Sequence, residues 1–383
     1  MGGVKGASIH VAEVCKALTE LGASVTLLAQ RLTGSVPDGV ELVLLDPGPL
    51  PRGPDGEPAR MAACDEFARR AAPVLARLRP DLVYERLSLF FGSGRELARN
   101  CGAARLVEVN APVTAERERH FGLALRAAGE LAEREALAGA RALVVSEPLV
   151  AFARQRGVAQ VEVVANGVDL GRFDPQRRRD EAGAVRRALR LEQAELVGFI
   201  GSLKPWHGVD VLLDAVELLA PSRPSLRLLV VGDGPCRPAL EARAANPGLR
   251  GRVIFTGALL PSTVAAHLIA LDVATAPYLQ SDYFYFSPLK VLEAMAAGRP
   301  LVASRFGPIA AMLAGTGLLV SPGDPVDLAG AIARLLEDPA AAAQLGLAAR
   351  RQAVRTGGWN LVATRILDAA APRGAGLSGA ARR

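Results

Sequence analysis

Strand-like and helix-like segments alternate along almost the whole chain of 383 residues. The strand-like segments are continuous apolar runs, which is typical of parallel strands buried on both faces of a sheet. In the first part of the chain they are SVTLLAQ (24–30), VELVLLD (40–46), DLVYERL (81–87), ARLVEVN (104–110), ARALVVS (140–146) and VEVVANG (161–167). Helices are predicted near 8–21, 59–78, 114–138 and 148–156. Gly22 is the expected left-handed C-cap of the first of them. This part is therefore predicted to be a parallel sheet covered by helices.

The alternation stops between Asp169 and Arg190 and then restarts. The second series is ELVGFIGSL (195–203), LRLLVVGDG (226–234), RVIFTGAL (252–259), DVATAPYL (272–279) and RPLVAS (299–304). We predict an α/β chain with two doubly wound units, 1–170 and 195–356, since 383 residues exceed the usual size of one core. The arginine-rich segment 171–194 is interpreted as a solvated linker with a surface helix, ahead of the alternative of an anion-binding patch.

Composition narrows the function classes only slightly. A net charge of +6 and a pI near 9.5 suit an anionic ligand or an acidic membrane surface, but the arginines are spread among acidic residues. The four cysteines lie far apart and predict neither a zinc site nor a disulfide framework; they are Cys15, Cys64, Cys101 and Cys236. No apolar run approaches the roughly 18 residues that span a bilayer. We expect a cytoplasmic protein whose contact with the inner membrane face, if it has one, is peripheral.

Glycines gather where strands are predicted to end. A glycine at such a position lets backbone N–H groups approach an anion at the start of the next helix, and a diphosphate fits that arrangement. For any single glycine, a tight turn is the alternative interpretation. Neither G-x-G-x-x-G nor the P-loop pattern occurs. The glycines concerned are Gly2, Gly3, Gly201, Gly208, Gly232, Gly234 and Gly257.

The stretch YFSPLKVLEAMAAGRPLVAS (285–304) is the most specific part of the sequence. Ser287 is predicted to cap a helix that begins at Pro288, so that free N–H groups face phosphate oxygens. Lys290 adds a full positive charge at the same end. Glu293 lies one turn further on among apolar neighbours, where its carboxylate is placed to accept hydrogen bonds from ribose hydroxyls.

At these residues the chain resembles a family 4 glycosyltransferase of the GT-B fold. The resemblance covers nearly the whole length and includes the glycine-rich start, VVANGVDLGRFDP (163–175), VGFIGSLKPWHGVDVLLDA (197–215), VVGDGP (230–235) and LEAMAAGRPLVAS (292–304). It implies retaining sugar transfer without a metal ion or cofactor, with a nucleotide-diphosphate sugar in the second domain and the acceptor in the first. It also implies that a final helix, 357–372, built around Trp359 and Ile366, crosses back to the first domain, followed by a flexible tail, 373–383.

The resemblance carries the family's functional positions onto this chain, with departures. Tyr285 stands where relatives often have the first of two glutamates, Ser202 and His207 stand where an Arg and a Lys are usual, and Asn110 replaces a histidine. Lys204, His207 and Lys290 are predicted to restore the missing positive charge, and His10 and His120 are candidates by residue type alone. The catalytic candidates are Lys290, His207 and Asn110. The donor-binding candidates are Gly2, Gly3, Gly201, Ser202, Lys204, Gly232, Gly257, Ser287, Pro288, Leu289 and Glu293.

Three other functions stay open at this point. A nucleotide-sugar epimerase or hydrolase would share the fold and the donor site, and a non-catalytic binding protein would explain the replaced residues. A nucleic-acid-binding protein is disfavoured because only 4% of residues are aromatic and the basic residues are not gathered on one element. The acceptor, whether a sugar, a lipid-linked or a small molecule, is not predicted, and neither are the base, the donor sugar and the oligomeric state.

The start of the sequence, MGGVKGASIH, raises a further expectation. In the fold that the chain resembles, the glycine loop follows a central apolar strand, which is absent here. Either the natural chain starts upstream of Met1 or the sheet is rearranged, and we favour the first. Its test is whether the preceding genomic sequence encodes an apolar β-run in frame.

Overall fold

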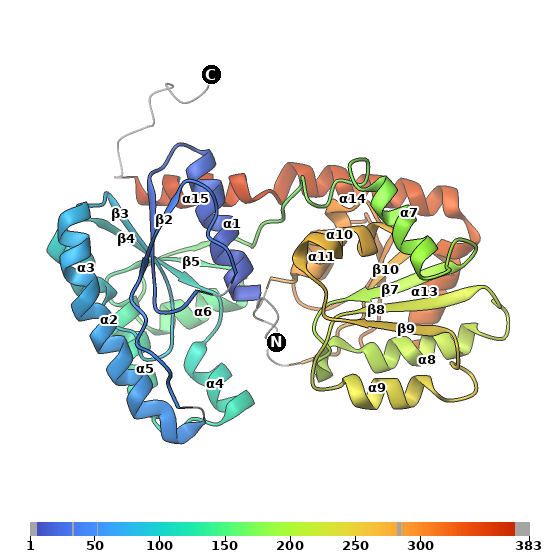
Figure 1. Cartoon of the computed structure of the whole chain (residues 1–383), viewed down its shortest axis with the longest axis horizontal. Coiled ribbons are helices and arrows are strands. Elements are labelled where there is room, and N and C mark those ends of the chain that lie inside the picture. The colour runs from blue at the N-terminus through green and yellow to red at the C-terminus, as the bar shows by residue number, and fades with distance from the viewer. Residues whose placement is uncertain (1–5, 33, 52, 282–284, 286, 372–383) are drawn as a thin grey trace. The chain divides into compact units, whose positions relative to one another are not determined.

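The computed structural model describes residues 6–32, 34–51, 53–281, 285 and 287–371 (Figure 1). Gly2, Gly3 and the expected tail 373–383 lie outside the described residues. The chain divides into two compact units. The N-terminal unit contains Gly6–Asn166, Tyr285–Ser287 and the chain from Trp359, and the C-terminal unit contains Gly167–Phe284 and Pro288–Gly358.

The N-terminal unit is built from parallel strands between helices. Its strands are β1 (Val25–Ala29), β2 (Val40–Leu44), β3 (Leu82–Arg86), β4 (Ala104–Val109), β5 (Arg141–Val144) and β6 (Gln160–Val163). Its helices are α1 (Gly6–Glu20), α2 (Glu57–Leu78) after the short η1 (Pro54–Gly56), α3 (Gly94–Cys101), α4 (Val113–Phe121), α5 (Arg126–Leu137), α6 (Pro148–Gln155) and α15 (Trp359–Ala370). The strands form two separate sheets, β1-β2 and β3-β4-β5-β6.

One predicted helix of this unit is two helices. The segment 114–138 breaks at Gly122, whose φ of 72° is in the left-handed region. The buried carboxylate of Glu57 then accepts hydrogen bonds from the backbone N–H groups of Ala124 and Leu125, at 3.0 and 2.7 Å. These bonds hold the connection between α4 and α5 against the start of α2, a constraint that helical periodicity does not reveal.

The prediction of burial on both faces is right for some strands of this unit and wrong for others. Leu106, Val107, Leu143 and Val144 in β4 and β5 are buried. Every residue of β1 and β3, in contrast, is only partly buried. The difference follows from the division of the sheet, because among the described residues β1 is paired only with β2 and β3 only with β4.

The C-terminal unit contains one six-stranded parallel sheet in the order β12-β11-β10-β7-β8-β9. Its strands are β7 (Glu195–Ile200), β8 (Leu226–Val231), β9 (Val253–Gly257), β10 (Val273–Ala276), β11 (Leu301–Ser304) and β12 (Leu318–Val320). Its helices are α7 (Arg179–Ala188), α8 (Val209–Leu219) after η2 (Pro205–His207), α9 (Arg237–Ala244), α10 (Pro261–Ile269), α11 (Leu289–Ala296), α12 (Ile309–Leu313), α13 (Pro325–Glu337) and α14 (Pro339–Thr356). The short strand β12 was not predicted, and α7 lies in the arginine-rich segment.

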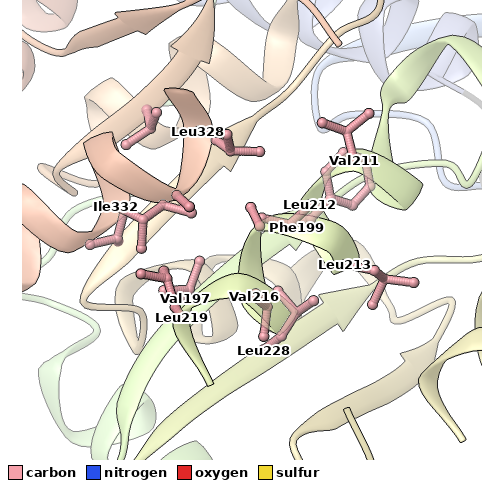
Figure 2. Close-up of a cluster of buried hydrophobic side chains, with 14 of the residues drawn as sticks. Val197, Phe199, Val211, Leu212, Leu213, Val216, Leu219, Leu228, Leu328 and Ile332 are labelled. Carbon is pink, nitrogen blue, oxygen red and sulfur yellow. The ribbon is translucent and has the colours of Figure 1, made fainter. Parts of the chain in front are cut away.

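The core of this unit lies between β7, β8 and the helices α8 and α13 (Figure 2). Val197, Phe199 and Leu228 project from the strands onto Leu212 and Val216 of α8. None of these side chains has measurable exposure, so this half of the sheet is rigidly packed. The rigid sheet fixes the positions of Gly201 and Tyr278, which follow β7 and β10.

Among the described residues, no helix combines the length and the hydrophobicity that a membrane-spanning segment requires.

The packing of α8 gives a stability prediction. Leu212→Ala should lower the free energy of unfolding by about 2–5 kcal/mol, because it leaves a cavity in a core that cannot collapse freely. Leu218→Ala is the matched control, since Leu218 lies on the same helix with 54% of its side chain exposed. Urea unfolding followed by circular dichroism measures both variants. Equal losses of stability would contradict the packing described for α8.

Candidate active site

The candidate site lies where the strand order of the C-terminal sheet reverses. β7 has β8 on one side and β10 on the other, so the connections after β7 and β10 run in opposite directions. In open parallel sheets, ligands bind at the carboxyl ends of strands at such a point. Gly201 follows β7, Tyr278 follows β10, and α11 comes next in the chain. The predicted donor residues of this unit therefore gather where the topology favours a ligand.

The ammonium group of Lys290 is the centre of this site. Its Nζ lies 4.4 Å from the ring centre of Tyr278 and 4.8 Å from that of Phe199. The Nζ is buried and has no hydrogen-bond partner among the described residues. Gly201 permits this position, because a Cβ there would lie 3.0 Å from Cε of Lys290. Burial lowers the pKa of Lys290 to about 7; Lys204 adds to this shift and Glu293 opposes it.

Glu293 faces the same region from the next turn of α11. Burial raises the pKa of its carboxyl group to about 7, although the charges of Arg172 and Lys290 lower it. Burial also raises the pKa of Tyr278, and the charge of Glu293 adds to that shift. The site therefore contains an acid and a base that both titrate near neutral pH, which is a feature of ligand-binding and catalytic sites.

The start of α11 differs from the prediction. The helix begins at Leu289, its N-cap is Pro288, and no described side chain caps it. Ser287 does not cap the helix because its hydroxyl oxygen accepts a hydrogen bond from the backbone N–H of Asn166, at 3.3 Å, within the N-terminal unit. The N–H groups of Leu289 and Lys290 precede the first bonds of the helix, which Val291 and Leu292 donate to Pro288.

His207 does not restore positive charge, contrary to the prediction. Its ring is buried among Phe199, Trp206 and Tyr278. Burial and the charges of Lys290 and Lys204 lower its pKa to about 3, although the hydrogen bond to Ser202 raises it. Nδ1 donates to the carbonyl oxygen of Ser202. The neutral imidazole therefore presents Nε2 as a hydrogen-bond acceptor.

The other predicted donor residues of this unit are of two kinds. Gly232 serves close backbone packing, because a Cβ there would lie 1.9 Å from the carbonyl oxygen of Gly201, and its N–H donates to Gly257 at 2.9 Å. Lys204 is exposed, with its Nζ 4.8 Å from the ring centre of Trp206. Lys204 is therefore a further cation near the site, whereas Gly232 and Gly257 shape the backbone behind Gly201.

Sequence reasoning missed the residues that hold α11 in place. Arg350 of α14 donates to the carbonyl oxygen of Ala296, at the end of α11, and to that of Phe173 at 3.3 Å. It also pairs with Asp174 at 2.9 Å. Arg350 thus joins α11 to the turn that carries Arg172, the residue whose charge acts on Glu293. An arginine inside an alanine-rich helix gives no sequence signal of this role, whereas Tyr278 was detectable as a polar group at a strand end.

Asn110 belongs to a different cluster, in the N-terminal unit. The buried carboxylate of Glu108 accepts hydrogen bonds from Asn110, Tyr84, His10 and Arg86; the His10 and Arg86 distances are 2.7 and 2.9 Å. Burial raises the pKa of Glu108, but His10 and Arg86 outweigh burial and lower it to about 2. His120 is exposed at the end of α4 and takes no part in this cluster. Glu108, missed by sequence reasoning, holds Asn110, His10 and Arg86 together.

The predicted site residues thus fall into three groups. The C-terminal unit brings together Gly201, Ser202, Lys204, His207, Gly232, Gly257, Pro288, Leu289, Lys290 and Glu293. The N-terminal unit contains Asn110 and Ser287. Gly2 and Gly3 lie outside the described residues.

Comparison with known proteins identifies the family. Residues 4–172 match Glycosyltransferase Family 4, and residues 194–338 match Glycosyl transferases group 1. A D-inositol 3-phosphate glycosyltransferase of Salinispora tropica is 30% identical over 96% of this chain and 81% of its own length. A 2-deoxystreptamine glucosyltransferase of Streptomyces kanamyceticus is 33% identical over 49% of each chain.

A solved structure shows the same fold. Anabaena Alr3699/HepE in complex with UDP superposes with a TM-score of 0.70 at 18% identity, over 96% of both chains. Together with the family matches, this similarity shows that the two Rossmann-like domains are those of a GT-B fold. The chain belongs to glycosyltransferase family 4, has the GT-B fold and is a glycosyltransferase.

Proposed function

We propose that the chain transfers a sugar, with retention of anomeric configuration, from a nucleotide-diphosphate sugar bound in the C-terminal unit. One observation carries this proposal: the buried Nζ of Lys290 has no hydrogen-bond partner among the described residues. A desolvated cation that lacks a hydrogen-bonded partner is costly, so the site is suited to receiving an anion from a ligand. The solved structures of HepE with UDP and with UDP-glucose support a donor of this class.

The proposal gives each residue of the site a role. Lys290 binds the diphosphate, together with the N–H groups of Leu289 and Lys290 at the start of α11 and the exposed Lys204. Glu293 accepts hydrogen bonds from the ribose hydroxyls. Neutral His207 accepts a hydrogen bond from a sugar hydroxyl through Nε2 and fixes the loop that carries Ser202.

The same groups account for catalysis. In retaining transfer the bond between the sugar and the diphosphate breaks through an oxocarbenium-like transition state, so negative charge grows on the leaving group. A fixed cation in a desolvated site stabilises that growing charge more than it stabilises the bound donor. We propose that Lys290 and the helix N-terminus supply this stabilisation without a metal ion or cofactor.

The acceptor is proposed to bind to the N-terminal unit, at the carboxyl ends of β3 and β4, where Glu108 holds Arg86 and Asn110. Two of the matched relatives are named for D-inositol 3-phosphate and 2-deoxystreptamine, so these compounds come first in an acceptor panel. Sugar and lipid-linked acceptors follow in the panel. With a lipid-linked acceptor, the protein would contact the cytoplasmic face of the inner membrane peripherally.

The function is tested by product analysis. The chain is incubated with nucleotide-diphosphate sugars, with and without acceptors, and products are identified by mass and by the anomeric proton coupling. We expect a new glycoside of retained configuration that requires the acceptor. Release of free or epimerised sugar without an acceptor would instead show a hydrolase or an epimerase.

The role of Lys290 is tested by substitution. Lys290→Met should lower kcat about 10²–10³-fold, the scale for removing a group that stabilises a developing oxyanion. Lys16→Met is the control, since Lys16 is an exposed lysine on α1. Wild-type kinetics in Lys290→Met would refute the assigned role.

The two neutral pKa values predict proton exchange on donor binding. In the free protein the pKa of both Glu293 and Lys290 is about 7. At about pH 6 Glu293 is mostly protonated. Hydrogen bonds from the ribose hydroxyls favour its ionised carboxylate, so donor binding should release a proton. At about pH 8 Lys290 is mostly neutral, and the diphosphate should draw a proton onto it.

Calorimetry in buffers of different ionisation enthalpy measures this exchange. We expect net proton release at about pH 6, uptake at about pH 8 and a change of sign near pH 7. Glu293→Gln should abolish the release alone, and Lys290→Met the uptake alone. Binding with no proton exchange at either pH would show that neither group meets the donor.

A further inference from the structure

The turn 168–174 of the C-terminal unit is fixed by one of its own carboxylates. Oδ1 of Asp169 accepts hydrogen bonds from the backbone N–H groups of Gly171 and Arg172, at 3.0 and 2.8 Å, and closes the turn. Oδ2 of Asp169 lies 3.5 Å from the guanidinium group of Arg172, whose side chain is 27% exposed. Asp169 therefore fixes both the backbone and the charged group of Arg172.

Helix α14 holds this turn at both of its ends. At the start, the backbone N–H of Val168 donates to the carbonyl oxygen of Gly357, the residue after α14, at 2.7 Å. At the end, Arg350 of α14 donates to the carboxylate of Asp174 at 2.9 Å. Arg172 lies between these two attachments, so its position is tied to that of α14.

The same helix holds α11. Arg350 also donates to the carbonyl oxygen of Ala296, the last residue of α11. Leu292 of α11 packs against Gly357, since a Cβ at Gly357 would lie 2.7 Å from Cδ1 of Leu292. Glu293 is the residue after Leu292. A single helix therefore positions the turn and Glu293 relative to each other.

The charged and titratable groups around Glu293 come from three elements. Arg172 on the turn lowers the pKa of Glu293 more than Lys290 on α11 does, and both act against burial, which raises it. Tyr278, after β10, has its own pKa raised by burial and by the charge of Glu293. Lys290, with a pKa of about 7, loses its charge as the pH rises through neutrality, whereas an arginine stays protonated. Arg172 is therefore a permanent positive charge that acts on Glu293.

Building on the ribose-binding role given to Glu293 above, we propose that Arg172 is a positioning residue of the donor site that keeps the Glu293 carboxylate ionised. An ionised carboxylate accepts hydrogen bonds from both hydroxyls of a cis-diol, whereas a protonated carboxyl group is itself a donor. Arg350 keeps Arg172 in place by attaching the turn to α14. Hydrogen bonds to the ribose are made alike in the bound donor and in the transition state. Arg172 therefore governs the affinity for the donor rather than the rate of bond cleavage.

The first test needs no donor. The labelled side-chain carboxyl carbon of Glu293 is followed by NMR as a function of pH and is assigned with Glu293→Gln. In Arg172→Met the midpoint of its titration should rise from about 7 by about one pH unit, because loss of an opposite charge disfavours the ionised form. Arg172→Lys should keep the wild-type midpoint. Arg177→Met is the matched control, since it removes a nearby exposed arginine and should leave the midpoint unchanged.

The second test measures donor binding and turnover, with UDP-glucose, the ligand in one HepE structure, or with the donor that the product assay identifies. A midpoint near 8 leaves about one tenth of Glu293 ionised at pH 7 instead of about one half, so the Kd of the donor should rise about fivefold in Arg172→Met. The kcat should stay within about twofold of the wild type. Above about pH 9 the two Kd values should converge, because Glu293 is then ionised in both proteins. A merely structural defect would instead weaken binding equally at every pH.

Three results would overturn the role of Arg172. They are an unchanged midpoint in Arg172→Met, the same shift in Arg177→Met, and a loss of affinity that does not depend on pH. If no donor binds to the wild-type chain, the proposed function fails, while the titration of Glu293 still decides whether Arg172 controls its charge. If Arg172→Met does not fold, Arg172→Gln replaces it with the same expected midpoint, because Gln keeps N–H donors without the charge.

Discussion

The chemistry of the C-terminal unit depends on one constraint, the removal of the Lys290 ammonium from water without a hydrogen-bond partner among the described residues. The sheet creates this constraint, because the connections after the neighbouring strands β7 and β10 run in opposite directions, and the rings of Phe199 and Tyr278 flank the cation there. Gly201 provides the space, and Arg350 fixes α11 to the turn that carries Arg172. Burial brings the pKa values of Lys290 and Glu293 toward neutrality. The protonation state of both groups is therefore expected to change when a donor binds.

The N-terminal unit is organised around a different buried charge. Glu108 keeps its carboxylate ionised by accepting hydrogen bonds from His10, Tyr84, Arg86 and Asn110, which come from α1, β3 and β4. Removing a partner of a buried carboxylate strongly destabilises a protein, because the charge is left uncompensated. The cluster therefore fixes these elements relative to each other.

The sequence predicted the architecture well because both-face burial produces continuous apolar runs, such as those of β4 and β8, that few other structures require. It predicted the residues around α11 because Pro288, Lys290 and Glu293 stand at fixed spacing before and within a helix. It failed where long-range contacts decide. Ser287 was assigned as a cap but accepts a bond from Asn166, and His207 was assigned a charge that burial removes. The hydrogen bond from Arg350 to Ala296 and the end of α4 at Gly122 produce no periodic pattern in the sequence, so neither could be predicted from it.

The central claim is that a nucleotide-diphosphate sugar meets the buried ammonium of Lys290. The most direct measurement is the thermal stability of the wild-type chain and of Lys290→Met against a panel of nucleotide-diphosphate sugars. A ligand present at about 100 times its Kd should add about 2.7 kcal/mol to the stability of the wild type. The account predicts this gain for at least one donor and a much smaller gain in the variant at the same concentration. Equal stabilisation of the two proteins, or none by any donor, would contradict it.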